Sequence, residues 1–326
     1  PVTGELPSTN SLFKTTVNMA WPSMVESFLV ALVGFIDTIM VSTLGSYAIA
    51  AVGLTQQPKF IGLALFMSMS TAISALVARR RGEQNRESAV RILKTCILVA
   101  VILTATISVT FTAFADPIIR FAGSADDTHE AAVEYFQIIM GGIGFTTVMM
   151  IVNAAQRGAG NTKIALRTNM VSNLVNVVFN YLLIGGNFGF PRLGVTGAAI
   201  GTLCARAAEL GVVLVYVFCF DKKLGAKLKN LLKADKLLMG DYFRHCKFFL
   251  IVAALFGTST ALQTVILGHL TDAAIAANAA SNSLFQILKV ASIGASASAA
   301  VMIGKAIATG DKNIVKSYTQ TLQIIF

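Results

Sequence analysis

The sequence predicts an all-α polytopic membrane protein of two pseudo-symmetric six-helix bundles, the second of them incomplete in this chain. Of the 326 residues, 55% are hydrophobic and 13% are charged, whereas about 25% charged residues is usual in soluble domains. Apolar runs of about 20 residues, each long enough to span a bilayer, recur along the whole chain. Segments on either side of one long charged stretch also resemble each other, which indicates an internal repeat.

The apolar segments predict eight complete spans and one that is only begun. In chain order they cover residues 13–44, 46–78, 90–115, 131–156, 163–185, 194–220, 243–268, 271–304 and 313–326. The first, second and eighth are longer than the hydrocarbon core, so they must tilt, kink or project beyond it. Because the last segment is cut short, we expect about three further helices to complete the second bundle.

A charged segment at residues 221–242 divides the chain. We expect a cytoplasmic N-terminal segment at 1–12, a first lobe of six spans at 13–220, a basic cytoplasmic linker at 221–242 and a second lobe at 243–326. Basic residues cluster in alternate loops, while the loops between them are short or acidic. This positive-inside distribution predicts a cytoplasmic N-terminus.

Several classes of function are disfavoured by composition. The net charge of +10 follows from the basic loops, and a nucleic-acid-binding protein would instead need a soluble basic face with aromatic platforms. The four cysteines form no C-x-x-C pair, and the three histidines lack the spacing of zinc ligands. The sequence has no acid pair or nucleophile arrangement, so we expect neither an enzyme nor a cofactor.

Asp37 is the most informative residue of the chain. It lies in a stretch from Trp21 to Leu44 where Glu26 is the only other formal charge. An ionised carboxylate at bilayer depth costs several kcal/mol, so such a residue indicates a functional site by default. The alternative is an interfacial acid, because only seven residues separate it from Leu44.

A ribbon of amides on the fifth span gives Asp37 a possible partner. Its members follow one another at intervals of four, three and four residues, so they share one helical face: Asn169, Asn173, Asn176 and Asn180. Such asparagines can also serve as interhelical hydrogen-bonding residues. Carboxylate and amide oxygens suit a hard cation such as Na⁺, and the same carboxylate could carry a proton instead.

The internal repeat aligns the two lobes in the same orientation. Residues 48–51 and 274–277 both read Ala-Ile-Ala-Ala, and at the same offset Asp37 aligns with Gln263 and Gln56 with Asn282. Because six spans precede the linker, both lobes begin on the same side of the membrane, an architecture typical of transporters with substrate between the halves.

Five motifs together resemble the multidrug and toxic compound extrusion (MATE) family, and the resemblance covers residues 13–326. The motifs are Trp21-Pro22, Asp37-Thr38-Ile39-Met40-Val41, the run Arg157-Gly158-Ala159-Gly160-Asn161-Thr162, Asn176-x-x-x-Asn180-Tyr181 and the run from Gly194 to Thr202. The resemblance implies two six-helix lobes that exchange Na⁺ or H⁺ for organic cations and other amphiphiles.

The same resemblance implies a cation site in the first lobe. Its residues would be Asp37, Asn176, Asn180, Ala198 and Thr202, with Ala198 offering its backbone carbonyl. Some relatives have a second acid at the position of Asn180, and many have a glutamate near residues 256–257; this chain has neither. We therefore expect the coupling chemistry to be concentrated in the first lobe.

Further polar residues in apolar spans are secondary candidates, each with an ordinary alternative. Glu26 lies three turns before Asp37 and is either a second ion station, a substrate counter-charge or an interfacial acid. Arg206 and Glu209, at i,i+3 spacing, form a structural pair or a substrate site. Lys59 and Lys289 either snorkel to the interface or line a cavity that accepts anions. Asn173, Gln56 and Asn282 complete the secondary set.

Pro22 interrupts the backbone hydrogen bonding of the first span, so it is either a hinge or a static kink. Taken together, the sequence predicts a Na⁺- or H⁺-coupled antiporter that exports amphiphilic molecules, with no metal site other than Na⁺ at Asp37. A lipid-linked or polysaccharide flippase is the alternative, kept open by Lys59, Lys289 and Arg206. We expect a monomer in the inner membrane of a prokaryote that binds no nucleic acid.

Overall fold

A computed structural model describes residues 9–221 and parts of the range 224–325. Its helices are α1 (Thr9–Ser42), α2 (Ser46–Leu54), α3 (Gln56–Gly82), α4 (Arg86–Ala113), α5 (Ala115–Phe121), α6 (Asp126–Gly141), α7 (Ile143–Gly158), α8 (Lys163–Gly185), α9 (Gly194–Val215) and α12 (Lys312–Ile325). Within these described ranges the regular structure is entirely helical, as predicted. Asn282, Lys289 and Gln263 lie outside the described residues.

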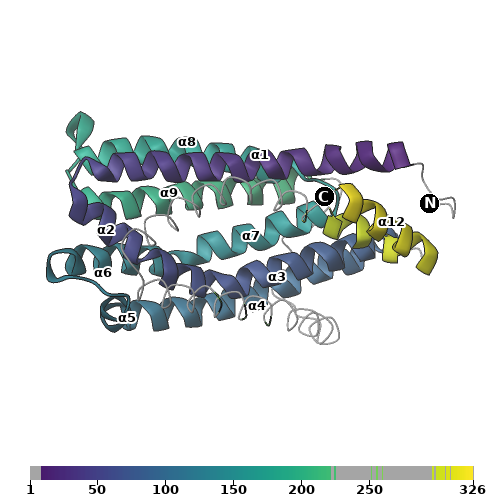
Figure 1. Ribbon diagram of the computed structural model, residues 1–326, viewed down its shortest axis with the longest axis horizontal. Helices are drawn as coiled ribbons and strands as arrows, with labels where there is room; N and C mark the ends of the chain where they lie inside the picture. Colours follow the sequence, from purple (N-terminus) through teal and green to yellow (C-terminus); the bar gives the residue numbers. More distant parts are fainter. Residues whose placement is uncertain are drawn as a thin grey trace.

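The long helices of residues 9–221 run side by side along the long axis of the molecule (Figure 1). On one side α1 lies against α8, and α8 packs closely on α9. On the other side α3 contacts both α4 and α7. The largest apolar core lies between α3, α4 and α7, around Phe66, Leu93 and Ile151, so the site between α1, α8 and α9 lies outside it.

In the part of the chain that the structure describes, four helical segments are long and apolar enough to cross a membrane: Trp21–Ser42, Pro58–Gly82, Arg86–Ala113 and Gly194–Phe220. The pair α6 and α7 counts as a fifth span if its two bent helices are taken together. α8 has the length of a span, but it is not among these segments, and four asparagines interrupt its apolar sequence. The polarity that marks α8 as unusual therefore comes from the residues that form the predicted ribbon.

The predicted second span, 46–78, is wrong as a single helix. The chain forms α2 and α3 instead, separated at Thr55, whose hydroxyl donates to the carbonyl of Val52 at 2.7 Å. Pro58 falls in the first turn of α3, where a missing N–H breaks no helical hydrogen bond. The proline thus marks a helix start rather than a kink in a continuous span.

The predicted fourth span, 131–156, is also divided. α6 and α7 meet at a 44° bend beside Gly141 and Gly142, and adjacent glycines are a common cause of such bends. The side chain of Leu203 from α9 lies where a Cβ of residue 142 would be. A side chain at residue 142 would therefore displace the Leu203 side chain.

Other boundaries differ by a few residues from the prediction. α1 begins at Thr9, within the segment predicted to precede the first span, and the short helix α5 was not predicted. α9 ends in one π-helical turn, Tyr216–Phe220. α1 remains a single helix through the buried Pro22, and the Lys163 ammonium of α8 lies 5.9 Å from the centroid of the neighbouring Trp21 ring.

A hydrogen-bonded chain fixes the turn between α5 and α6. His129 Nε2 lies 2.7 Å from Asp116 Oδ1, and His129 Nδ1 lies 2.7 Å from the hydroxyl of Ser124. Arg120 Nε donates to the other oxygen of Asp116 at 3.2 Å. These bonds, first that of His129 and then that of Arg120, hold the pKa of Asp116 below its ordinary value of 3.8.

Candidate functional site

The predicted site residues of the described lobe converge on one cavity of about 480 Å³. It lies between α1, α2, α3, α6, α8 and α9. Nine of its lining residues were candidates from the sequence: Asp37, Gln56, Lys59, Asn173, Asn176, Asn180, Ala198, Thr202 and Arg206. Residues more than 140 positions apart in the sequence, such as Asp37 and Asn180, are thus brought together by the packing of α1 against α8.

Asp37 stands at the end of a chain of side-chain hydrogen bonds. Asn180 Nδ2 donates to Asp37 Oδ1 at 2.8 Å and approaches Asn176 Oδ1 at 3.4 Å. Asn176 Nδ2 in turn lies 3.4 Å from the hydroxyl of Thr202 on α9. An amide that donates to a carboxylate stabilises the ionised acid, so this arrangement fits an Asp37 that carries its negative charge.

Asn180 also carries an orphan acceptor. Its Oδ1 is buried without a hydrogen-bond partner in the described part of the chain, and a buried polar atom left unpaired costs about 1–3 kcal/mol. Rotation of the amide would turn this oxygen towards Asp37. The carboxylate, the amide oxygens of Asn176 and Asn180 and the Thr202 hydroxyl are a donor set that suits Na⁺.

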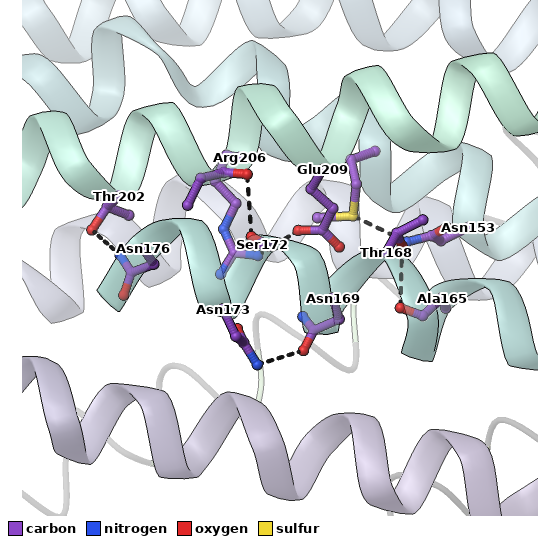
Figure 2. Close-up of polar contacts among 12 residues, drawn as sticks. Asn153, Ala165, Thr168, Asn169, Ser172, Asn173, Asn176, Thr202, Arg206 and Glu209 are labelled. Atoms are coloured by element: carbon purple, nitrogen blue, oxygen red, sulfur yellow. Dashed lines mark hydrogen bonds and ion pairs between the residues drawn. The ribbon is translucent and has the colours of Figure 1, made fainter. Parts of the chain in front are cut away.

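The rest of the amide ribbon continues along α8 from Asn176 to Asn173 and Asn169 (Figure 2). Asn173 Nδ2 donates to Asn169 Oδ1 at 3.0 Å, and the Ser172 hydroxyl donates to the carbonyl of Ala205 on α9 at 3.2 Å. Asn169 is buried, and it is absent from the cavity lining while Asn173 is part of it. The ribbon therefore serves two purposes, with one end facing the cavity and the other held within the helix packing.

Arg206 and Glu209 form the ion pair that their spacing predicts. Arg206 Nη1 lies 2.8 Å from Glu209 Oε2, and Glu209 is 1% exposed. Figure 2 shows both side chains projecting from α9 towards α8. Arg206 also lines the cavity. The two residues therefore form a structural ion pair, and one of them also belongs to the candidate site.

The secondary candidate on α1 lies apart from Asp37. Glu26 is not among the residues that line the cavity, and its charged neighbours are Arg157, Glu209 and Arg206. Its role as an ion station stays a prediction. Pro22, one turn away on the same helix, is buried, and its role as a hinge likewise stays a prediction.

Sequence reasoning missed the part that four residues play in the site. Tyr135 of α6 and Ser172 of α8 line the cavity, but no periodic pattern marked them. Gly197 and Gly201 of α9 face α8 so closely that a Cβ at 197 would lie 2.6 Å from the Leu183 carbonyl oxygen, and one at 201 would collide with Asn180 Oδ1. The small-x-x-x-small spacing of these glycines could have indicated the contact.

Comparison with known proteins agrees with this architecture. Residues 22–182 match the family model described as MatE. A probable multidrug resistance protein NorM from Thermotoga maritima is 30% identical over 206 residues, which cover 63% of this chain and 44% of that protein. A FAD transporter from Shewanella oneidensis is 25% identical over 199 residues, covering 61% of this chain and 44% of the other.

Among solved structures, an outward-facing multidrug resistance MATE transporter of the MOP superfamily has the same fold, with a TM-score of 0.83 at 22% identity. The match covers 98% of this chain and 71% of that one. The chain spans about half the length of the curated relatives that it matches. On this evidence the protein belongs to the MATE family, whose members are multi-pass membrane transporters rather than enzymes.

Proposed function

We propose that the protein is a Na⁺- or H⁺-coupled antiporter that exports amphiphilic small molecules, organic cations among them, by alternating access. The observation that carries the proposal is the Asp37 carboxylate, held by Asn180 at 2.8 Å inside a cavity of the helix bundle. One negative charge neutralises one monovalent ion in a region of low dielectric. An organic cation that approaches Asp37 would compete with that ion, which is the requirement for exchange.

Coupling requires the ion to bind one conformation more tightly than the other. The described geometry offers a means, because rotation of the Asn180 amide would replace a hydrogen bond by an ion ligand. α1 carries both Asp37 and Pro22, so ion occupancy could bias a bend in that helix. We propose a monomer in the inner membrane of a prokaryote with a cytoplasmic N-terminus, a setting supported by the bacterial relatives.

Efflux from vesicles that contain the full-length protein tests this function, with Na⁺ and H⁺ gradients imposed separately. Asp37→Asn conserves volume and should abolish gradient-driven efflux while leaving the fold intact. Asp126→Asn, at the exposed first residue of α6 and outside the cavity, is the matched control and should transport normally. Normal efflux by a well-folded Asp37→Asn protein would refute the proposal.

A lipid-linked or polysaccharide flippase is the second candidate. Lys59 and Arg206 line the same cavity as Asp37, and such cations favour phosphate-bearing substrates. One relative is named a FAD transporter, and FAD is an anion. A flippase would move a fluorescent lipid phosphate across vesicles without an ion gradient, whereas the antiporter requires the gradient.

A further inference from the structure

Lys59 is a charged residue of the cavity to which the proposed antiport gives no role. It lies in the first turn of α3 and lines the cavity that contains Asp37. Its ammonium has no hydrogen-bond or ion-pair partner within the described residues, although it lies within electrostatic range of Asp37 and Arg206. A charged group among membrane helices normally has a partner or a function.

The net charge of the cavity depends on whether Asp37 is ionised. Among the described residues, Asp37, Lys59 and Arg206 are the charged ones that line it, and the charge of Arg206 is compensated by Glu209 at 2.8 Å. With Asp37 ionised, the Asp37 and Lys59 charges cancel. When a cation neutralises Asp37, the positive charge of Lys59 remains, and the cavity acquires a net affinity for an anion.

We propose that Lys59 is the receptor for an anionic group, a carboxylate or a phosphate, on an amphiphilic ligand of this cavity. The proposal adds a ligand class to the cavity of the proposed function and rests on that function for the role of Asp37. The charges set the sign of the coupling between ion and ligand, and the coupling is reciprocal. An organic cation competes with the coupling ion, whereas an anionic ligand binds more tightly once the ion is bound.

A place for the apolar body of such a ligand lies next to Lys59. An open cavity of about 1150 Å³ adjoins the α2–α3 junction and is lined by Phe111, Phe114 and Phe121. Pro58 lines this apolar cavity while the next residue, Lys59, lines the polar one, and Gly53 lines both. A Cβ at Gly53 would meet nothing within 4 Å, so a side chain added there would project into open space at the wall that the two cavities share.

Binding to the full-length protein in phosphatidylcholine nanodiscs tests the assignment. The probes are a dansyl-labelled fatty acid and its uncharged methyl ester, which share shape and apolar surface. Lys59→Met should weaken binding of the acid by about ten- to hundredfold, the range of one charge-assisted hydrogen bond, and leave the ester unchanged. Lys59→Arg should retain the preference for the acid, and Lys163→Met, which removes a lysine outside the cavity, should not affect it.

The coupling between ion binding at Asp37 and binding of the acid at Lys59 is measured separately. Binding of the acid should tighten as Na⁺ or H⁺ rises, and Asp37→Asn should bind the acid tightly at every ion concentration. Gly53→Leu should weaken acid and ester alike, because its side chain would occupy space at the shared wall of the two cavities. Equal affinities of acid and ester in the wild type, equal losses for both in Lys59→Met, or unaltered binding in Gly53→Leu would each overturn the proposal.

The source of the anionic group is decided by adding phosphatidylglycerol to the nanodiscs. If phosphatidylglycerol displaces the labelled acid from the wild type but not from Lys59→Met, the site binds a lipid headgroup. If phosphatidylglycerol displaces no acid, the site binds the soluble amphiphile. These measurements do not depend on transport. If Asp37→Asn still exported substrate, the coupled function would fail while discrimination by Lys59 could still be scored separately.

Discussion

At the scale of single residues, the site is defined by how its charges are compensated. Asp37 receives a hydrogen bond from a neutral amide, Arg206 is paired with Glu209, and Lys59 has no partner in the described ranges. A neutral donor leaves the charge of Asp37 available to an ion, whereas the paired Arg206 is held in place. The three charged residues therefore differ in their freedom to respond to a ligand.

The Arg206–Glu209 pair should behave as a structural unit when it is broken. Arg206→Met leaves the Glu209 carboxylate, 1% exposed, without its partner, and we expect a loss of about 3–5 kcal/mol in the free energy of unfolding. Arg206→Met combined with Glu209→Gln should recover most of that loss. Thermal unfolding of the purified variants measures both, and a double variant no more stable than the single one would contradict this interpretation.

Asp116 predicts a pH dependence outside the membrane spans. Hydrogen bonds from His129 and Arg120 lower its pKa below 3.8 in the folded protein, so its ionised form stabilises the α5–α6 turn. That contribution is complete above 3.8 and disappears as the pH falls through the lower folded value.

Amide hydrogen exchange of residues 114–129 should therefore be faster in Asp116→Asn than in the wild type at neutral pH. The two proteins should converge as the pH falls below 3.8, the ordinary value for this acid. A difference that grows on acidification would show that the carboxylate does not stabilise the turn.

At the scale of helices, the contact between α8 and α9 positions the site. Gly201 allows α9 to approach so closely that Asn180 Oδ1 occupies the space of a Cβ, while Thr202, the next residue, reaches Asn176. The glycine and the hydroxyl on successive positions of α9 together fix where the amides of α8 can lie.

Gly201→Ala should push Asn180 away from its place and destabilise the protein by about 1–3 kcal/mol, as overpacking does. Ion-coupled efflux should fall with it, because the amide no longer meets Asp37. Gly211→Ala is the matched control on the same helix, since a Cβ there meets nothing within 4 Å. Equal effects of the two substitutions on stability and efflux would exclude a specific role for Gly201.

The sequence predicts the helices better than their interruptions. Span lengths follow from local hydropathy, and the shared face of Asn173, Asn176 and Asn180 follows from helical periodicity. The division at Thr55 and the bend at Gly142 are not marked by hydropathy, and residue 142 lies against Leu203 of a distant helix. Tyr135 reaches the site only through tertiary packing, so no pattern along the chain could identify it.

At the scale of the whole molecule, the polar cavity is built from six helices of residues 9–221. The side chains of the proposed cation site, from Asp37 to Thr202, therefore all come from the first lobe. The asymmetry predicted from Gln263 concerns residues outside those described. The fold nevertheless matches a MATE transporter over 98% of this chain.

The fluorescence of Trp21 should report on the conformation of α1. Trp21 is the only tryptophan of the 326 residues, it precedes Pro22, and its ring lies 5.9 Å from the ammonium of Lys163 on α8. Indole emission responds to a nearby cation, so a bend of α1 at Pro22 should alter the fluorescence of the unlabelled protein. Addition of the coupling ion should shift the emission of the wild type but not of Asp37→Asn, and Lys163→Met should reduce the shift. Ion binding near one end of α1 could then be followed in real time at the other, without any introduced probe.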